Sequence, residues 1–258
     1  MKHRIRAGLL HLLISLVLVS SVMAFVLLIC YPEPYFTALG AGKLLLVLAC
    51  VDVGLGPLIT FLIFVPGKKG LKFDLVFIAV VQLAALTYGA TTLFLGRPVY
   101  IVFSENHFSL VSAYQIPSEV LEDLHNPSLP MNGPKLVGAR IPADKAERKK
   151  YINAVLVRYH VDLPRLVQYH VPYSDMVKEV KLSMFALEEL LAKQKPEQLP
   201  KAKAMLDKAV ASTGLPYDRL AYVPMSEQSS SLVVLIRRSD ASVVSVLPID
   251  PYGRPLSQ

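Results

Sequence analysis

Cysteine is scarce in this 258-residue sequence. Both cysteines, Cys30 and Cys50, lie inside apolar runs, and residues 99–258 contain none. A disulfide framework and a thiolate metal site are therefore excluded from that part of the chain. A domain without disulfides is compatible with the periplasm but does not require it.

Motifs that carry catalysis or phosphate binding are also lacking. The chain has no G-x-S-x-G, P-loop or G-x-G-x-x-G sequence. Its six histidines form no H-x-x-H or H-E-x-x-H pair, so we interpret them as ordinary surface or core residues. The segment Glu227–Ser231 is interpreted as a polar loop rather than a nucleophile motif. We therefore expect no enzyme, cofactor or metal.

A clustered basic face is missing from the second half. Residues 1–98 carry eight Lys or Arg and three Asp or Glu, whereas residues 99–258 carry nineteen and seventeen. The net charge of +7 is thus mostly set by the first half. A nucleic-acid-binding domain needs a concentrated positive surface, so we expect no nucleic-acid partner.

Long apolar stretches are abundant in the first half. A helix rises about 1.5 Å per residue, so roughly 20 residues cross the hydrocarbon core. The expected spanning helices occupy residues 7–31, 44–65 and 71–95. A cleaved signal peptide ending at Val22-Met23-Ala24 is the alternative for the first, but the apolar run continues past that site and favours an uncleaved anchor.

Lysine and arginine flank these helices unevenly. Six lie before the first span, between the second and third, or at the very start of the third: Lys2, Arg4, Arg6, Lys68, Lys69 and Lys72. The loop between the first two spans has only Lys43. The positive-inside rule then predicts a multi-pass protein of the bacterial inner membrane, with a cytoplasmic N-terminus and a periplasmic C-terminal domain.

Two acids lie within the expected spans. Asp52 is about eight residues into the second, where a charge costs about 2.5–3.5 kcal/mol on insertion scales. It is either a partner contact or titrating site, or a protonated or hydrogen-bonded residue that holds the second helix against the other two. Asp74 is three residues into the third span, where either an interfacial ion pair with nearby lysines or a partner contact fits.

The second span also contains residues that favour close helix approach and a kink. Gly54, Gly56 and Pro57 follow Asp52 closely. They indicate either tight packing within a three-helix bundle or a groove for a helix of another protein. These three residues, with Asp52 and Asp74, are the candidate contacts for a partner helix.

Residues 99–258 alternate strand and helix patterns. A hairpin is expected from Tyr100–Ser104 and His107–Ala113, with Glu105-Asn106 as its turn. Helices are expected at Ser118–His125, Ala143–His160, Ser174–Gln194 and Pro200–Ser212, and strands at Lys135–Ile141, Arg219–Pro224, Ser231–Arg238 and Val243–Pro248. Residues 1–98 are thus expected to form a transmembrane domain with three helices, and residues 99–258 a soluble α+β domain.

The order of several segments resembles the TfpX/TfpZ family of type IV pilin accessory proteins. The segments are Tyr31–Phe36, Val51–Thr60, Pro66–Leu75, Gln82–Leu86 and Arg97-Pro98. The resemblance is dense over residues 1–113 and looser beyond, mainly through Val171-Pro172-Tyr173 and the last strands. It implies a non-enzymatic inner-membrane protein that assists the stability, assembly or surface display of a particular major pilin.

Three functions remain to be distinguished. The first is a chaperone-like or assembly factor whose partners are the cognate major type IV pilin, other pilus assembly proteins and the membrane. The second is a periplasm-facing membrane sensor, against which the short cytoplasmic segments argue. The third is a membrane enzyme that uses Asp52 or a periplasmic histidine, against which the absence of a clustered motif argues.

Overall fold

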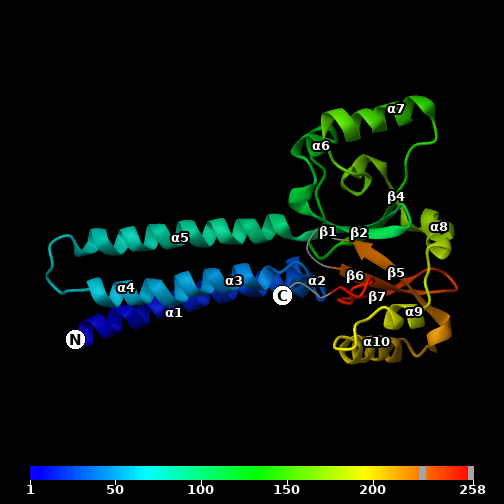
Figure 1. The fold of residues 1–258 in the computed structure, drawn as a ribbon. Helices are drawn as coiled ribbons and strands as arrows, with labels where there is room; N and C mark the ends of the chain where they lie inside the picture. The colour runs from blue at the N-terminus through cyan, green and yellow to red at the C-terminus, as the bar shows by residue number, and fades with distance from the viewer. Residues whose placement is uncertain (227–230, 255–258) are drawn as a thin grey trace. The chain divides into compact units, whose positions relative to one another are not determined.

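The structure is a computed structural model that describes residues 1–226 and 231–254. The chain forms two compact units, Met1–Arg97 and Pro98–Gln258, both drawn in Figure 1. The predicted polar loop at Glu227–Ser230 lies outside the described residues, and Ser231 begins a strand.

The described residues include three helices that are long and apolar enough to cross a membrane. The first span consists of α1 (Lys2–Phe25) and the π-helical turn η1 (Val26–Cys30). The second consists of α3 (Ala41–Ala49), the π-helical turn η2 (Cys50–Leu55) and α4 (Gly56–Ile63). The third is α5 (Leu71–Gly96). A short helix, α2 (Tyr35–Ala38), joins the first two. The predicted fold class is confirmed for this unit.

The helix ends differ from the predicted ones for local reasons. The first span begins at Lys2 rather than residue 7, because the basic residues before the apolar run also take helical geometry. The second begins at Ala41 rather than residue 44, directly after Gly40, whose φ of +66° is left-handed. It ends at Ile63 rather than residue 65, since Phe64 is already extended.

Small residues let the three spans approach closely. A Cβ on Gly8 of α1 would lie 3.2 Å from the Cβ of Phe61 in α4. A Cβ on Gly89 of α5 would lie 2.5 Å from a methyl group of Leu48 in α3. Helix association in lipid depends on such packing and on interhelical hydrogen bonds. One such bond runs from the buried Tyr31 hydroxyl to the Leu93 carbonyl, 2.8 Å away.

The second unit is built on a seven-stranded mixed sheet in the order β4-β3-β1-β2-β5-β6-β7. Its strands are β1 (Pro98–Ser104), β2 (His107–Ser112), β3 (Lys135–Ala139), β4 (His170–Pro172), β5 (Leu220–Ser226), β6 (Ser231–Arg237) and β7 (Val243–Leu247). The pairs β1/β3 and β2/β5 are parallel, and the other neighbours are antiparallel. The predicted α+β class is therefore confirmed.

Both predicted hairpins form. The turn between β1 and β2 is Glu105-Asn106, and both residues have positive φ, as tight two-residue hairpins require. The turn between β6 and β7 falls at Ser239–Ser242. The short strand β4 has no counterpart among the predicted strands, because three residues give no measurable alternation.

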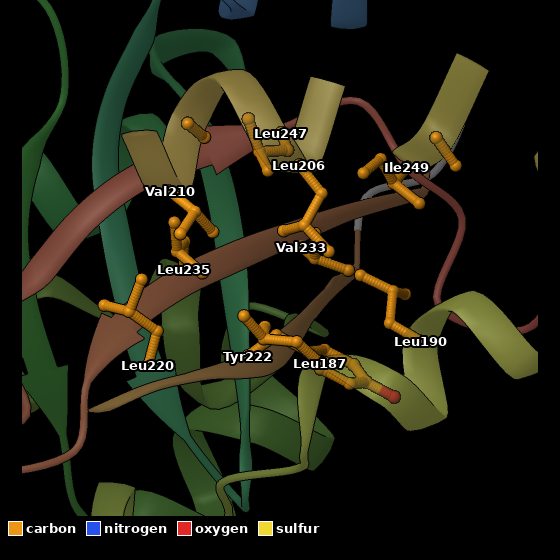
Figure 2. Close-up of a cluster of buried hydrophobic side chains, with 12 residues drawn as sticks. Leu187, Leu190, Leu206, Val210, Leu220, Tyr222, Val233, Leu235, Leu247 and Ile249 are labelled. Carbon is orange, nitrogen blue, oxygen red and sulfur yellow. The ribbon is translucent and has the colours of Figure 1, made fainter. Parts of the chain in front are cut away.

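The helices of this unit have six to fifteen residues, and two clusters of buried side chains join helices to the sheet. They are α6 (Ser118–Asp123), α7 (Lys145–Asn153) with the π-helical turn η4 (Ala154–Arg158), α8 (Val177–Leu182), α9 (Leu187–Ala192) and α10 (Leu199–Thr213). Helices α9 and α10 cover β5–β7 and form the α10 core, shown in Figure 2: Leu187, Leu190, Leu206, Val210, Leu220, Tyr222, Val233, Leu235, Leu247 and Ile249. A second core joins β1–β3 to α6.

The prediction of one helix over Ser174–Gln194 is wrong. The chain leaves helical geometry between α8 and α9, and Phe185 pairs with Tyr222 of β5 through two backbone hydrogen bonds of 2.9 and 3.0 Å. Strand β2 pairs with β5 only near Met225, so the β5 edge is free at Tyr222. Phe185 satisfies that edge, and this non-local pairing overrides the local helical pattern.

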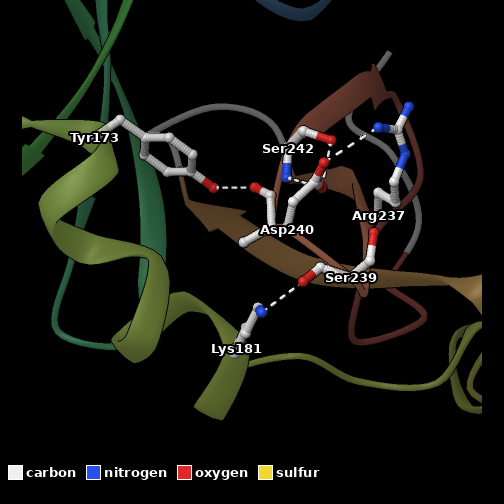
Figure 3. Close-up of polar contacts among 7 residues, drawn as sticks. Tyr173, Lys181, Arg237, Ser239, Asp240 and Ser242 are labelled. Atoms are coloured by element: carbon white, nitrogen blue, oxygen red, sulfur yellow. Dashed lines mark hydrogen bonds and ion pairs between the residues drawn. The ribbon is translucent and has the colours of Figure 1, made fainter.

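The β6–β7 turn is tied to the segment before α8, as Figure 3 shows. Tyr173 begins the 3₁₀ turn η7 (Tyr173–Met176), and its hydroxyl donates to the Ala241 carbonyl over 2.7 Å. Lys181 of α8 donates to the Ser239 carbonyl. Within the turn, an Asp240 carboxylate oxygen accepts from the backbone N–H and the hydroxyl of Ser242. Burial, with the Asp240 charge, raises the pKa of Tyr173 to about 12, so the hydroxyl is a donor at neutral pH.

Replacement of Tyr173 by phenylalanine is expected to lower the free energy of unfolding of this unit by about 1 kcal/mol, because it removes one donor and leaves the Ala241 carbonyl unpaired. Urea unfolding of residues 98–258 measures the change. Tyr114→Phe is the control, since Tyr114 is exposed. An unchanged midpoint for Tyr173→Phe would mean that water replaces the hydroxyl without loss.

Candidate site among the membrane-spanning helices

The backbone of the second span is irregular at Asp52. The Gly56 N–H bonds to the Val51 carbonyl, five residues back rather than four, and Pro57 has no N–H to offer. The Asp52 carbonyl therefore loses its partner within the helix. Gln82 of α5 compensates, because its Nε2 donates to that carbonyl over 3.3 Å. The sequence Gly56-Pro57 thus creates an acceptor that the third span satisfies.

Gly54 and Gly56 lie in different environments. A Cβ on Gly56 would overlap the side-chain amide of Gln82, whereas a Cβ on Gly54 would meet nothing within 4 Å. Gly56 and Pro57 are buried in the helical unit, and Gly54 is exposed. Of the two glycines, only Gly56 is needed for packing within this unit.

The Asp52 carboxyl is enclosed by the helices, with only 4% of the residue exposed. Its Oδ2 and the Oε1 of Gln82 are buried and have no hydrogen-bond partner among the described residues. An unsatisfied buried polar group costs about 1–3 kcal/mol. Two such atoms in one place therefore need an explanation, which is either a proton held by the Asp52 carboxyl or a donor from a partner.

A second polar contact joins the first span to the second. The His11 Nδ1 of α1 and the Thr60 hydroxyl of α4 share a hydrogen bond of 2.6 Å. It fixes α1 against α4, just as Gln82 fixes α5 against η2. The three spans are thus joined by the side chains of His11, Thr60 and Gln82 and by the backbone carbonyl of Asp52.

A cavity of about 180 Å³ lies beside this polar group. Its lining residues are His11, Ile14, Ser15 and Leu18 of α1, Asp52 of η2, and Ala79, Gln82, Leu83 and Leu86 of α5. Helices α1 and α5 both pack on the second span but scarcely contact each other. The cavity is therefore a groove between the first and third spans, and Asp52 lies at its floor.

Asp74 lies at one end of the helical unit. Its carboxylate pairs with Lys68 over 2.6 Å, in the first turn of α5 where the helix dipole favours a negative charge. Lys68 and Asp74 are both partly exposed, so the pair contributes less than about 1 kcal/mol. Arg4 lies at the end of the second span, where its Nε donates to the Phe64 carbonyl over 2.9 Å.

In the second unit, the histidines are separated, and the residues that the structure describes contain no group of three or more metal-binding side chains. Of these histidines, His170 is packed most closely by its neighbours. Its Nε2 donates to the Pro164 carbonyl over 2.9 Å, and its ring meets Tyr100 edge-on, 4.9 Å between centroids. Burial lowers the pKa of the His170 imidazole, and the bond to Pro164 opposes this only in part.

The His170 environment predicts a pH-dependent stability. Because its folded pKa is below the unfolded value of about 6.5, the neutral ring stabilises the fold fully above that pH. Stability is then lost as the pH falls from about 6.5 towards the folded pKa. Urea unfolding of residues 98–258 at about pH 7.5 and 5.5 should show this fall, reduced in His170→Gln and retained in His160→Gln. Equal falls in all three proteins would contradict it.

Sequence reasoning identified Asp52, Gly56 and Pro57 but not the residues that surround them. The sequence pattern treats His11 as an ordinary surface or core histidine, and Gln82 enters only through the family resemblance. Polar side chains inside a span are rare and face protein, so His11, Thr60 and Gln82 carried a usable signal. Which of them meet depends on how the helices are rotated, and no local pattern gives that.

Comparison with known proteins shows which family this chain is similar to. The family model described as fimbrial assembly protein FimB matches residues 1–40. The fimbrial assembly protein of serogroup E1 from Dichelobacter nodosus is 25% identical over 249 residues, which cover 94% of this chain and 93% of that protein. The fimbrial assembly protein of serogroups C1 and C2 from the same organism is 34% identical over 104 residues, 40% of this chain and 79% of that protein. No solved structure matches significantly.

The match to the serogroup E1 protein extends through both units. The chain belongs to the fimbrial assembly protein FimB family.

Proposed function

We propose that this protein is a TfpX/TfpZ-type pilin accessory factor, which assists the stability, assembly or surface display of one cognate major type IV pilin without catalysing a reaction. The observation that carries the proposal is similarity to a fimbrial assembly protein over 94% of the chain. The similarity extends through both units, which supports a role that uses a membrane part and a soluble part together.

The proposed location is the bacterial inner membrane, with the N-terminus in the cytoplasm and residues 98–258 in the periplasm. The uneven distribution of lysine and arginine supports this orientation. The bond from Arg4 to Phe64 also supports it, because it brings the N-terminus to the same end of the helical unit as the Lys68–Asp74 pair. A C-terminal alkaline phosphatase fusion should be active and a C-terminal GFP fusion dark; the reverse would reject this orientation.

The layout of the chain suits a pilin held in the membrane. Such a pilin has one apolar helix in the bilayer and a globular head outside it. In the proposed complex, the spans contact the pilin helix and the sheet domain contacts the pilin head. Asp52, Gly54, Gly56 and Pro57 are the candidate contacts with the helix, and Asp74 is the candidate contact near the pilin N-terminus.

Deletion of the gene tests the function directly. We expect lower pilin levels and loss of surface pili and twitching, with recovery on complementation by the full-length chain. Other pilus assembly proteins should remain at normal levels. Normal surface pili in the deletion strain would reject the accessory function.

Co-purification tests the candidate contacts. Pilin recovered with the full-length protein should decrease for Asp52→Ala and Asp74→Ala, compared at equal expression. Leu58→Ala is the matched control, since Leu58 is an exposed residue of the same second span and lies outside the cavity. Unchanged pilin recovery with both aspartate variants would remove these residues from the contact.

A further inference from the structure

The groove between α1 and α5 has an apolar rim and a polar floor. Its rim is apolar, and Ile14, Leu18 and Leu83 are all exposed on it. Its floor holds the buried Asp52, whose Oδ2 has no partner, next to Gln82, whose Oε1 has none among the described residues. Both orphan atoms are acceptors, so an occupant that satisfies them must bring hydrogen-bond donors.

The chemistry of the floor limits what fills the groove. A lipid chain covers the apolar rim but brings no hydrogen-bond donor to Asp52. A membrane-spanning helix covers the same rim and carries its donors on side chains, while its backbone groups are satisfied internally. The groove also contains Ser15 and Ala79, and small residues let a further helix approach closely.

We propose that this groove receives the membrane helix of the fimbrial subunit, and that a hydrogen-bond donor in the middle of that helix reaches the Asp52 carboxyl. The proposal rests on the proposed function and specifies its partner chemistry. It places the contact on the α1 and α5 side of Asp52. The exposed Gly54 lies outside the cavity lining and is not needed for it.

Site-specific photo-crosslinking in the full-length protein tests the location. The photo-reactive amino acid p-benzoylphenylalanine replaces Leu83, 53% exposed on the rim, in cells that make the cognate pilin. Phe77, 61% exposed on the same helix but outside the cavity, is the control position. We expect the pilin adduct to be at least about tenfold stronger from Leu83. Equal yields, or an adduct only with a second copy of this chain or with lipid, would overturn the proposal.

Substitutions at the floor test the chemistry. Asp52→Leu removes both carboxylate acceptors and should lower the yield of the Leu83 adduct about tenfold. A tenfold change corresponds to about 1.4 kcal/mol, which is about the contribution of one hydrogen bond. Asp52→Asn keeps one acceptor and should stay within about threefold of the wild type. Equal loss in both variants, or no loss in either, would overturn the hydrogen-bond assignment.

A steric variant keeps the test valid if Asp52→Leu fails to fold. Ala79→Trp fills the groove and leaves the floor intact, and Val81→Trp places the same bulk on an exposed position of α5 outside the cavity. Only Ala79→Trp should abolish the adduct.

If the deletion strain lacks pili but Leu83 never crosslinks to pilin, the groove assignment fails and the accessory function stands. If the deletion strain has normal pili, the accessory function itself fails, and the partner named here fails with it.

Discussion

Replacement of Gly56 by valine is expected to destabilise the helical unit by about 3 kcal/mol. The new side chain would occupy the position of the Gln82 amide. Overpacking of this kind costs about 1–3 kcal/mol. Displacement of Gln82 also breaks its bond to the Asp52 carbonyl, which neither Gly56 nor Pro57 can replace, and an orphaned buried carbonyl costs about 1–3 kcal/mol more.

Gly54→Val is the matched control. The same side chain is added two residues away in the same helix, where a Cβ would meet no atom within 4 Å. Its effect should stay within about 0.5 kcal/mol, the usual range for exposed positions. Thermal or detergent-titrated unfolding of the full-length protein in micelles, followed by helical circular dichroism, compares the two. Equal destabilisation would mean that glycine flexibility, not contact with Gln82, decides stability here.

The three spans could be predicted because their signal is local. Hydrocarbon length and flanking lysines are properties of contiguous residues, and they placed each span within a few residues of its observed ends. The break at Gly56-Pro57 was predicted for the same reason, since proline cannot complete a helical hydrogen bond. The hairpin turn at Glu105-Asn106 also depends on adjacent residues alone.

The contacts of the candidate site and the split between α8 and α9, which the sequence did not predict, are non-local. Gln82 reaches a carbonyl 30 residues earlier, and His11 bonds to Thr60 49 residues later. The split between α8 and α9 depends on Phe185 meeting a free edge of β5. Each contact requires a helix rotation or a strand order that neighbouring residues do not encode, so the candidate site appeared in sequence as separate residues.

The second large effect is expected in the sheet domain. Leu206 of α10 is fully buried in the α10 core, between the helix and the sheet, as Figure 2 shows. Leu206→Ala removes most of a packed side chain and leaves a cavity, so the free energy of unfolding of this unit should fall by about 2–5 kcal/mol. Urea unfolding of residues 98–258 measures this, because that unit has its own cores.

The matched control is Leu182→Ala in α8. Leu182 is 81% exposed, so the same chemical change there should cost less than about 0.5 kcal/mol. Helix α10 packs on the sheet that β5, β6 and β7 share, so a cavity beneath it should weaken the whole sheet. In cells, a loss of this size increases the fraction of unfolded protein and its degradation, so Leu206→Ala should also reduce protein level and surface pili. If Leu206→Ala unfolds at the wild-type urea concentration, α10 does not support the sheet, and its buried leucine is not needed for the fold.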